Sequence, residues 1–323
     1  MRTVALEEHF WIDRLADEGD SAILSRAFGP QLTEDLRDLA EGRLAAMDAS
    51  GIDVQVLSHN TPAAQQLPTT EAIPAAREAN DTLARAVAAH PGRFAGFATL
   101  PTADPAAAAD ELERSVGEHG FVGAMVNSTL GTNGKFLDDP SFEPLFARAE
   151  RLNVPLYLHP SAPPDMLRET LYGGFEPPLQ MRLATGAWGW HAELGLSAVR
   201  LVLAGVFERH PNLRVVLGHC GEMLPFMLGR IDQMLPPERT GLPLLPSEYF
   251  LRNVWITTSG LFTVPPVLCS IAVFGVDRVL FSVDYPYSAN DDGRQLLNEL
   301  PVSPADLAKI AGGNADRLLG LQS

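Results

Sequence analysis

Short apolar runs recur along the chain, and each has the length of a buried strand. The runs hold four to seven residues, mostly Val, Ile, Leu, Phe and Ala, and they lack the polar alternation of a half-exposed strand. Near-continuous apolar strands are typical of a parallel sheet that is covered on both faces. The chain has eight such runs, at residues 3–6, 54–58, 94–100, 121–126, 154–158, 213–218, 254–259 and 278–283.

Helical patterns separate most of these runs. In residues 32–51, apolar side chains such as Leu36 and Met47 recur near the helical spacing. Gly51 then suits a C-terminal cap, and Ser303, followed by a proline, suits an N-cap near the other end of the chain. The remaining predicted helices span residues 70–90, 104–120, 139–153, 193–210, 221–234, 264–275 and 303–321.

This alternation of strands and helices predicts the fold class. Eight strands with eight intervening helices are typical of an α/β chain folded as a (β/α)₈ TIM-type barrel, in this case as one domain over residues 1–323. The alternative is a doubly wound open sheet. No G-x-G-x-x-G motif follows the first run, so a dinucleotide site is not supported.

Two connections are long, and both follow predicted strands. Residues 10–31 follow the first strand and residues 160–192 follow the fifth. Loops longer than about 15 residues are usually functional lids or disordered segments. The second connection contains Phe175, Trp188 and Trp190, which argue against disorder.

Composition and charge exclude several classes of partner. The chain has 24 basic and 40 acidic residues, a net charge of −16, without a Lys/Arg cluster, so nucleic acid and anionic membranes are not expected partners. No apolar run reaches about 18 residues, so no membrane span is expected. Cys220 and Cys269 are too few for a disulfide framework, and Glu7 and Glu8 interrupt any secretory leader, which together favour the cytoplasm.

Polar residues stand where several of the apolar runs end. The first run leads into Glu7, Glu8 and His9, and the spacing puts Glu7 and His9 on one side of a strand with Glu8 on the other. His159 follows the fifth run and Asp284 follows the eighth. A barrel brings the carboxyl ends of its strands to one rim, so we expect these groups to meet there.

The mixture of side chains at the rim predicts a catalytic metal centre. Glu7, His9, His159 and Asp284 form a nitrogen and oxygen ligand set that suits one divalent ion, Zn²⁺, Mn²⁺ or Fe²⁺ rather than Ca²⁺ or Mg²⁺. Three or four protein ligands leave a position for water or substrate. Any one of these residues alone would more often be a strand cap or a solvated group.

Other histidines and the thiols give weaker signals. His59 and His191 could each face the pocket or the core, and the sequence leaves both readings open. Cys220 lies beside a histidine, but no base and orienting group can be identified around it, so a nucleophilic thiol is not favoured.

The motifs together resemble the amidohydrolase-2 family. They are ALEEHF at the start, LHP after the fifth run, GHCGE with RID eight residues on, TTSG, and FSVDYPY. Within the family they are most similar to metal-dependent aromatic-acid decarboxylases of the γ-resorcylate type. The resemblance covers almost the whole chain and implies a distorted (β/α)₈ barrel that assembles as a homodimer or homotetramer.

The resemblance also implies roles for individual residues. It assigns the metal ligands to Glu7, His9, His159 and Asp284, the histidine near the metal and the substrate to His219, its acidic partner to Glu222, and the arginine of RID to Arg230. The chain departs from the resorcylate type at Tyr285 and Tyr287, where that type resembles Trp and Phe. The substituents on the substrate ring therefore stay open.

The implied reaction is the non-oxidative decarboxylation of a hydroxylated aromatic acid, a carbon–carbon lyase reaction. The metal, Zn or Mn, would hold the carboxylate and an ortho oxygen while Asp284 protonates the ring carbon. His219, polarised by Glu222, would orient the substrate or relay the proton. Trp11, Tyr285, Tyr287 and the second long connection would form an aromatic-lined pocket. The main alternative is a metal-dependent hydrolase of an ester, lactone or amide; a hydratase and a protein that only binds are weaker ones.

Overall fold

A computed structural model describes residues 1–16, 29–130 and 135–321 of the chain. Its centre is an eight-stranded parallel sheet whose spatial order follows the order along the chain. The strands are β1 (Val4–Phe10), β2 (Val54–His59), β3 (Phe94–Thr99), β4 (Gly123–Asn127), β7 (Leu156–His159), β8 (Val215–Leu217), β9 (Val254–Thr257) and β10 (Val279–Leu280). A small hairpin, β5 (Thr129–Leu130) and β6 (Lys135–Phe136), lies outside this sheet.

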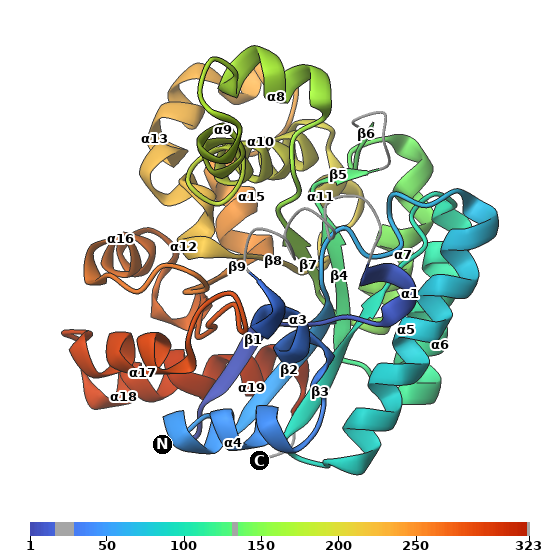
Figure 1. Cartoon of the computed structure of the whole chain (residues 1–323). Helices are drawn as coiled ribbons and strands as arrows, with labels where there is room; N and C mark the ends of the chain where they lie inside the picture. Colours follow the sequence, from blue (N-terminus) through green and yellow to red (C-terminus); the bar gives the residue numbers. More distant parts are fainter. Residues whose placement is uncertain (17–28, 131–134, 322–323) are drawn as a thin grey trace.

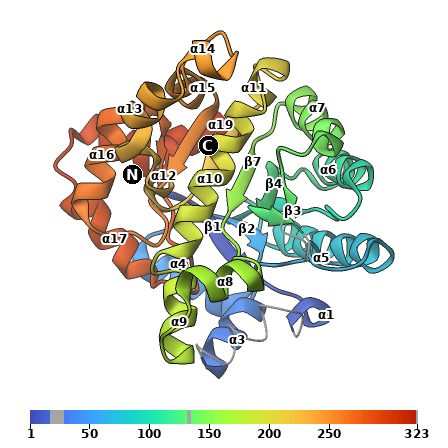
Figure 2. The same ribbon diagram turned by 90° about the horizontal axis from the view of Figure 1, so that it is seen from above.

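Backbone hydrogen bonds close the sheet between its first strand and the segment after its last. The Asp284 N–H donates to the Glu7 carbonyl at 2.9 Å, and the His9 N–H donates to the Tyr285 carbonyl at 2.7 Å. Helices surround the strands, as the view from above shows (Figure 2). The predicted (β/α)₈ barrel is therefore confirmed.

The barrel has an inner and an outer apolar layer, which explains why the strands are nearly continuous apolar runs. Val4, Leu6 and Val56 pack in the barrel interior, whereas Ala5 and Leu57 on the same strands pack under the helices. All residues of β1, β2 and β3 are buried. Burial on both faces removes the polar alternation that a one-sided sheet would show.

Helices connect the strands of the barrel and follow the last of them. They are α1 (Asp13–Ala16), α3 (Pro30–Arg37), α4 (Glu41–Ser50), α5 (Thr69–Ala89), α6 (Pro105–His119), α7 (Glu143–Leu152), α8 (Asp165–Tyr172), α9 (Pro177–Ala184), α10 (Gly189–Leu203), α11 (Val206–Arg209), α12 (His219–Glu222), α13 (Leu224–Met234), α14 (Pro237–Thr240), α15 (Pro246–Asn253), α16 (Val264–Phe274), α17 (Asn290–Glu299), α18 (Pro304–Ala308) and α19 (Asn314–Leu319).

The predicted helix over residues 32–51 was wrong as one element, because it divides into α3 and α4. Asp38 ends the first helix in an extended conformation, and its carboxylate accepts hydrogen bonds from the backbone N–H groups of Ala40 and Arg43. The fully buried Arg43 guanidinium then donates to the carbonyls of Asp38 and His9. These contacts order the break and join it to the strand that carries the metal-ligand candidates.

Other predicted helices are also divided. Gly205, in the left-handed conformation, separates α10 from α11 within residues 193–210. Within 303–321 a π-helical segment, Lys309–Gly313, separates α18 from α19. Several described helices lie in stretches for which the apolar pattern predicted no element, namely α14, α15 and α17, and α1, α8 and α9 in the long connections.

The two long connections differ in how far they are described. Most of residues 10–31 lies outside the described residues. The connection over 160–192 is ordered and contains α8 and α9, which lie beyond the ring of helices (Figures 1 and 2). Among the described helices, no segment combines the length and apolar character needed to cross a bilayer.

Candidate metal centre and active site

The four candidate metal ligands come from three strand ends. Glu7 and His9 lie on β1, His159 is the last residue of β7, and Asp284 follows β10 in a left-handed conformation with φ 74°. The register of β1 is irregular between Ala5 and Glu8. Since Leu6 already faces the barrel interior, this irregularity allows Glu7 and His9 to face it too, as bulges do when they re-aim side chains.

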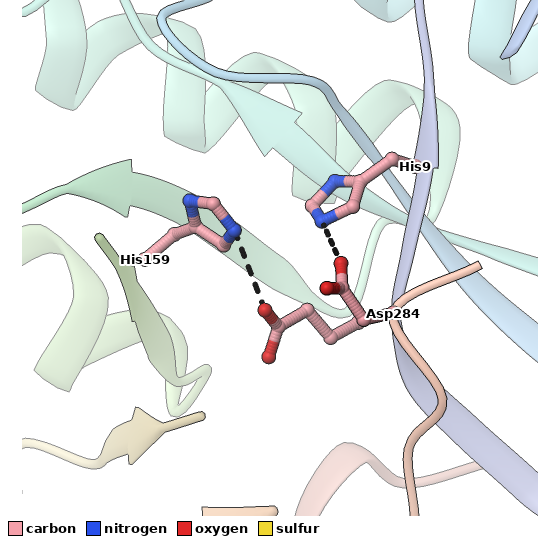
Figure 3. A group of neighbouring side chains, drawn as sticks. His9, His159 and Asp284 are labelled. Carbon is pink, nitrogen blue, oxygen red and sulfur yellow. Dashed lines mark ion pairs between the residues drawn. The ribbon is translucent and has the colours of Figure 1, made fainter. Parts of the chain in front are cut away.

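The side chains of these four residues converge on one point. One potential ligand atom from each residue, four in all, lies within 4.8 Å of the other three. His9 Nε2 is 3.1 Å from Asp284 Oδ1, and His159 Nε2 is 3.3 Å from Glu7 Oε1. Figure 3 shows the ring of His9 facing the Asp284 carboxylate and the ring of His159 pointing toward the same group of side chains.

The chemistry of this cluster fits a divalent ion. Glu7 Oε1 and His9 Nε2 are buried and form no hydrogen bond of good geometry among the described residues, although another ligand candidate lies within 3.3 Å of each. Buried polar atoms without a partner are costly, so their convergence indicates a ligand that both can bind. Two imidazoles with two carboxylates favour Zn²⁺ or Mn²⁺, as the sequence predicted.

Surrounding groups fix the orientation of Glu7. The hydroxyls of Tyr157 and Ser259 donate to Glu7 Oε2, which leaves Oε1 directed at the cluster. A Cβ atom at Gly218 would lie 2.6 Å from the same Oε2, so glycine is needed for this close approach. Burial raises the pKa of Glu7, but His219, His159 and His9 outweigh it and hold the pKa far below its ordinary value. Glu7 is thus an oriented anion, as a metal ligand should be.

Glu8 points away from the cluster and connects β1 to the segment after β10. Its carboxylate accepts hydrogen bonds from the backbone N–H groups of Val283 at 2.9 Å and Tyr285 at 3.0 Å. Burial outweighs these bonds and raises the pKa of Glu8 to about 8. Because these two backbone groups flank Asp284, Glu8 sets the position of the fourth ligand candidate.

His219 and Glu222 lie next to the cluster and contact each other. The Nδ1 atom of His219 is 2.7 Å from Glu222 Oε1, and its Nε2 atom is 3.8 Å from Glu7 Oε1. Burial lowers the pKa of His219, but the carboxylates of Glu222 and Glu7 raise it to about 10. Glu222 also contacts His191, whose Nδ1 is 2.7 Å from Oε2.

A cavity of about 180 Å³ opens onto the cluster. Of the ligand candidates, His159 and Asp284 contribute to its wall, together with His219. Its full lining is Asn60, Thr61, His159, Gly186, Trp190, His191, His219, Gly260, Leu261, Asp284, Tyr287 and Ser288.

The cavity decides between the two readings that the sequence left open for His59 and His191. His191 lines it. His59 does not, because its Nε2 accepts a hydrogen bond from the backbone N–H of Ile12 at 3.1 Å.

The predicted aromatic wall is found only in part. Tyr287 and Trp190 line the cavity formed by the described residues, whereas Trp11 and Tyr285 do not. Trp11 packs instead with Leu32 and Leu36, and the Tyr285 ring lies against the Arg43 guanidinium.

Arg230 is placed apart from the other predicted site residues. It lies exposed on α13, where its guanidinium donates to Gln233 Oε1 at 2.7 Å, and it does not line the cavity formed by the described residues. Its role in the chemistry stays a prediction.

Sequence reasoning missed some cavity residues, namely Thr61, Ser288, Gly260 and Leu261. Thr61 lies two residues after β2, and Gly260 lies three residues after β9. A search a few residues past each predicted strand end would have found them.

Comparisons with known proteins agree with this geometry. A family model described as Amidohydrolase matches residues 8–321. The chain is 39% identical to the γ-resorcylate decarboxylase of Rhizobium sp. strain MTP-10005 over 329 residues, which cover 98% of each chain. It is also 39% identical to decarboxylase orsB of Emericella nidulans, over 98% of this chain and 96% of that protein.

A solved structure agrees with the fold and carries a bound metal ion. The dihydroxybenzoic acid decarboxylase of Polaromonas sp. JS666, with bound manganese and the inhibitor 2-nitroresorcinol, superimposes with a TM-score of 0.91 at 35% identity. The superposition covers 99% of this chain and 97% of that one. With its closed parallel barrel and its Glu-x-His, His and Asp cluster, this chain belongs to the amidohydrolase family.

Proposed function

We propose that this protein is a metal-dependent carboxy-lyase that removes CO₂ from a hydroxylated aromatic acid without oxidation. The observation that supports it most directly is the position of Asp284, which belongs both to the ligand cluster and to the wall of the cavity. A carboxyl group placed there can reach the bound ring. The similarity to decarboxylases over nearly the full chain favours this reaction over the hydrolysis of an ester, lactone or amide.

The size of the cavity fits a substrate with one ring. A cavity of about 150 Å³ is known to hold benzene, and the present one is about 180 Å³. Trp190 lines it with its ring.

The difficult step is protonation of the ring carbon that bears the carboxylate, because it interrupts aromaticity. A bound Mn²⁺ or Zn²⁺ held by Glu7, His9, His159 and Asp284 would act as a Lewis acid toward the carboxylate and an ortho oxygen. In its acid form, Asp284 transfers its proton to the ring carbon. The bond to the carboxylate then breaks, CO₂ leaves, and the bonding electrons restore the ring. Asp284 regains a proton from solvent.

His219 orients the substrate during this step. Its Nδ1 is held by Glu222, so Nε2 faces the cavity and the ligand cluster. An imidazole N–H directed there donates a hydrogen bond to a substrate oxygen and stabilises the negative charge that returns to that oxygen when the bond to the carboxylate breaks. Neither His219 nor Glu222 has to react covalently.

A panel of compounds tests the proposed reaction. The protein loaded with Mn²⁺ or Zn²⁺ is incubated with hydroxylated benzoates, including 2,6-dihydroxybenzoate, and separately with aryl esters and lactones. We expect CO₂ and the matching phenol from at least one benzoate, and no acid release from the esters and lactones above the metal-only control. Acid release without any CO₂ would contradict the proposal and favour a hydrolase.

We propose further that the protein is a homodimer or homotetramer. Large apolar side chains are exposed on α8 and α13, among them Met166 at 78%, Leu171 at 64% and Phe226 at 84%. Clustered exposed apolar side chains commonly mark interfaces. Light scattering should give a mass of about 70 or 140 kDa, two or four times the chain mass of 34.9 kDa. A mass of one chain would contradict this.

We also propose that residues 1–323 form one domain and that the protein acts in the cytoplasm. The hydrogen bonds between β1 and the segment after β10 tie the beginning of the chain to its last quarter, which supports a single domain. Cys220 and Cys269 are both free thiols, which suits a reducing compartment.

A further inference from the structure

Glu222 joins two histidines. Its carboxylate is 1% exposed, and each oxygen is 2.7 Å from the Nδ1 atom of a different imidazole: Oε1 from His219 and Oε2 from His191. The two rings stand edge to face with their centres 4.8 Å apart. Both carboxylate oxygens of Glu222 therefore have a partner. One of these partners, His191, comes from another helix, α10.

Helix α10 contacts Glu222 at two positions, His191 and Gly195. His191 and Gly195 are one helical turn apart, so they share a face of α10. A Cβ atom at position 195 would lie only 2.8 Å from the Glu222 carbonyl oxygen. Glycine at 195 therefore lets the helix lie directly on the Glu222 backbone, and His191 reaches the carboxylate from the turn before.

The segment that carries His219 and Glu222 needs this support. Residues 219–223 all have positive φ, between 45° and 81°, although only Gly221 among them is a glycine. Left-handed conformations of side-chain-bearing residues persist when surrounding contacts hold them, and they cluster at functional sites. The supporting contacts include Ser259, whose Oγ accepts from the His219 N–H at 2.9 Å, and His191 on the Glu222 carboxylate.

The ring of His191 is fixed at both nitrogens. Nδ1 faces Glu222 Oε2 at 2.7 Å, and Nε2 faces the carbonyl oxygen of Gly186 at 3.0 Å. Both partners are hydrogen-bond acceptors, so each ring nitrogen lies against a group that holds the ring in place. Gly186 belongs to the connection after α9, so His191 ties that connection to Glu222.

We propose that His191 is a positioning residue, which holds Glu222 from the side of α10 so that His219 keeps its Nε2 atom aimed at the bound acid. His191 lines the cavity but acts through Glu222 rather than on the reacting atoms. This inference deepens the proposed function. Its kinetic test rests on the proposed function, whereas its spectroscopic test is independent of it.

The variants are His191→Leu and His191→Asn, which have nearly the same size. Only Asn places an N–H where Nδ1 of the histidine contacts Glu222. We expect kcat for CO₂ release to fall about 10–100-fold in the Leu variant, the range found when groups supporting a metal site are removed, with KM changed less than kcat. The Asn variant should recover most of the loss. Equal losses in both variants, or none in the Leu variant, would overturn the proposal.

Metal analysis and spectroscopy accompany the kinetics. The unchanged protein and each variant should hold one ion per chain. A second ion that is present in the unchanged protein and lost in the Leu variant would show that His191, His219 and Glu222 bind a metal, and would overturn the proposal. In zinc-loaded protein with ¹⁵N-labelled histidine rings, the Nδ1–H proton of His219, assigned with His219→Gln, should be resolved at low field. It should broaden or exchange faster in the Leu variant.

The spectroscopic result separates the two proposals. An unchanged His219 resonance in the Leu variant would overturn the positioning role even in an active enzyme. A lost resonance in a protein that releases no CO₂ from any acid would support the positioning role and remove the proposed reaction. If the Leu variant does not fold, His191→Ala with the same readouts takes its place.

Discussion

Replacing Asp284 by Asn is expected to lower kcat for CO₂ release by about 10²–10⁴-fold, the range for loss of a general acid. Asn has the same size, and its carbonyl oxygen can still face the cluster where Oδ1 now lies 3.1 Å from His9 Nε2. It has no acidic proton to give to the ring carbon. The measurement is single-turnover CO₂ release at matched metal occupancy, with metal content determined on the same sample.

The matched control is Asp292→Asn on α17. Asp292 is exposed and does not line the cavity, so the same chemical change should leave kcat within about twofold, as surface substitutions usually do. If Asp284→Asn retained full activity with metal bound, the proton would come from another group, and the mechanism proposed for Asp284 would be removed.

Replacing Glu7 by Gln should have the second large effect, a fall in metal affinity of about 100-fold or more, because removal of even a supporting group costs 10–100-fold. Glu7 Oε2 already accepts from Tyr157 and Ser259, so the amide must place its NH₂ group either against those donors or toward the ion. Both arrangements are unfavourable, and the negative charge is lost. Competition with a chromogenic chelator gives the affinity.

Glu238→Gln is the control for this variant. Glu238 is exposed on α14, and its replacement removes the same charge from a distant part of the surface. Its metal affinity should match that of the unchanged protein. If Glu7 is a ligand, CO₂ release should fall together with metal occupancy. Equal metal affinities in the Glu7 variant and the unchanged protein would show that Glu7 is not a ligand.

The local pattern of the sequence predicted the barrel and the composition of the ligand cluster. Strands buried on both faces are nearly continuous apolar runs, so the runs at 3–6 and 54–58 could be identified without any tertiary information. Because the carboxyl ends of all barrel strands lie at one rim, His159 and Asp284 were predicted to lie near Glu7 and His9. The structure brings these four residues together as expected.

Long-range contacts determine what the sequence did not predict. The break between α3 and α4 depends on Arg43 reaching the His9 carbonyl, which no helical pattern contains. The left-handed run that begins at His219 depends on Ser259 and α10. In the same way, the contact of His191 with Glu222 joins residues 31 positions apart, and only the folded chain shows it.

The claim at the centre of this account is that Glu7, His9, His159 and Asp284 bind one divalent ion. Anomalous diffraction from crystals of the manganese-loaded protein tests it most directly. The account predicts a single strong peak within about 2.0–2.3 Å of Glu7 Oε1, His9 Nε2, the His159 ring and an Asp284 oxygen. A fully loaded crystal with its anomalous peak elsewhere, or with these side chains bonded only to one another, would contradict it.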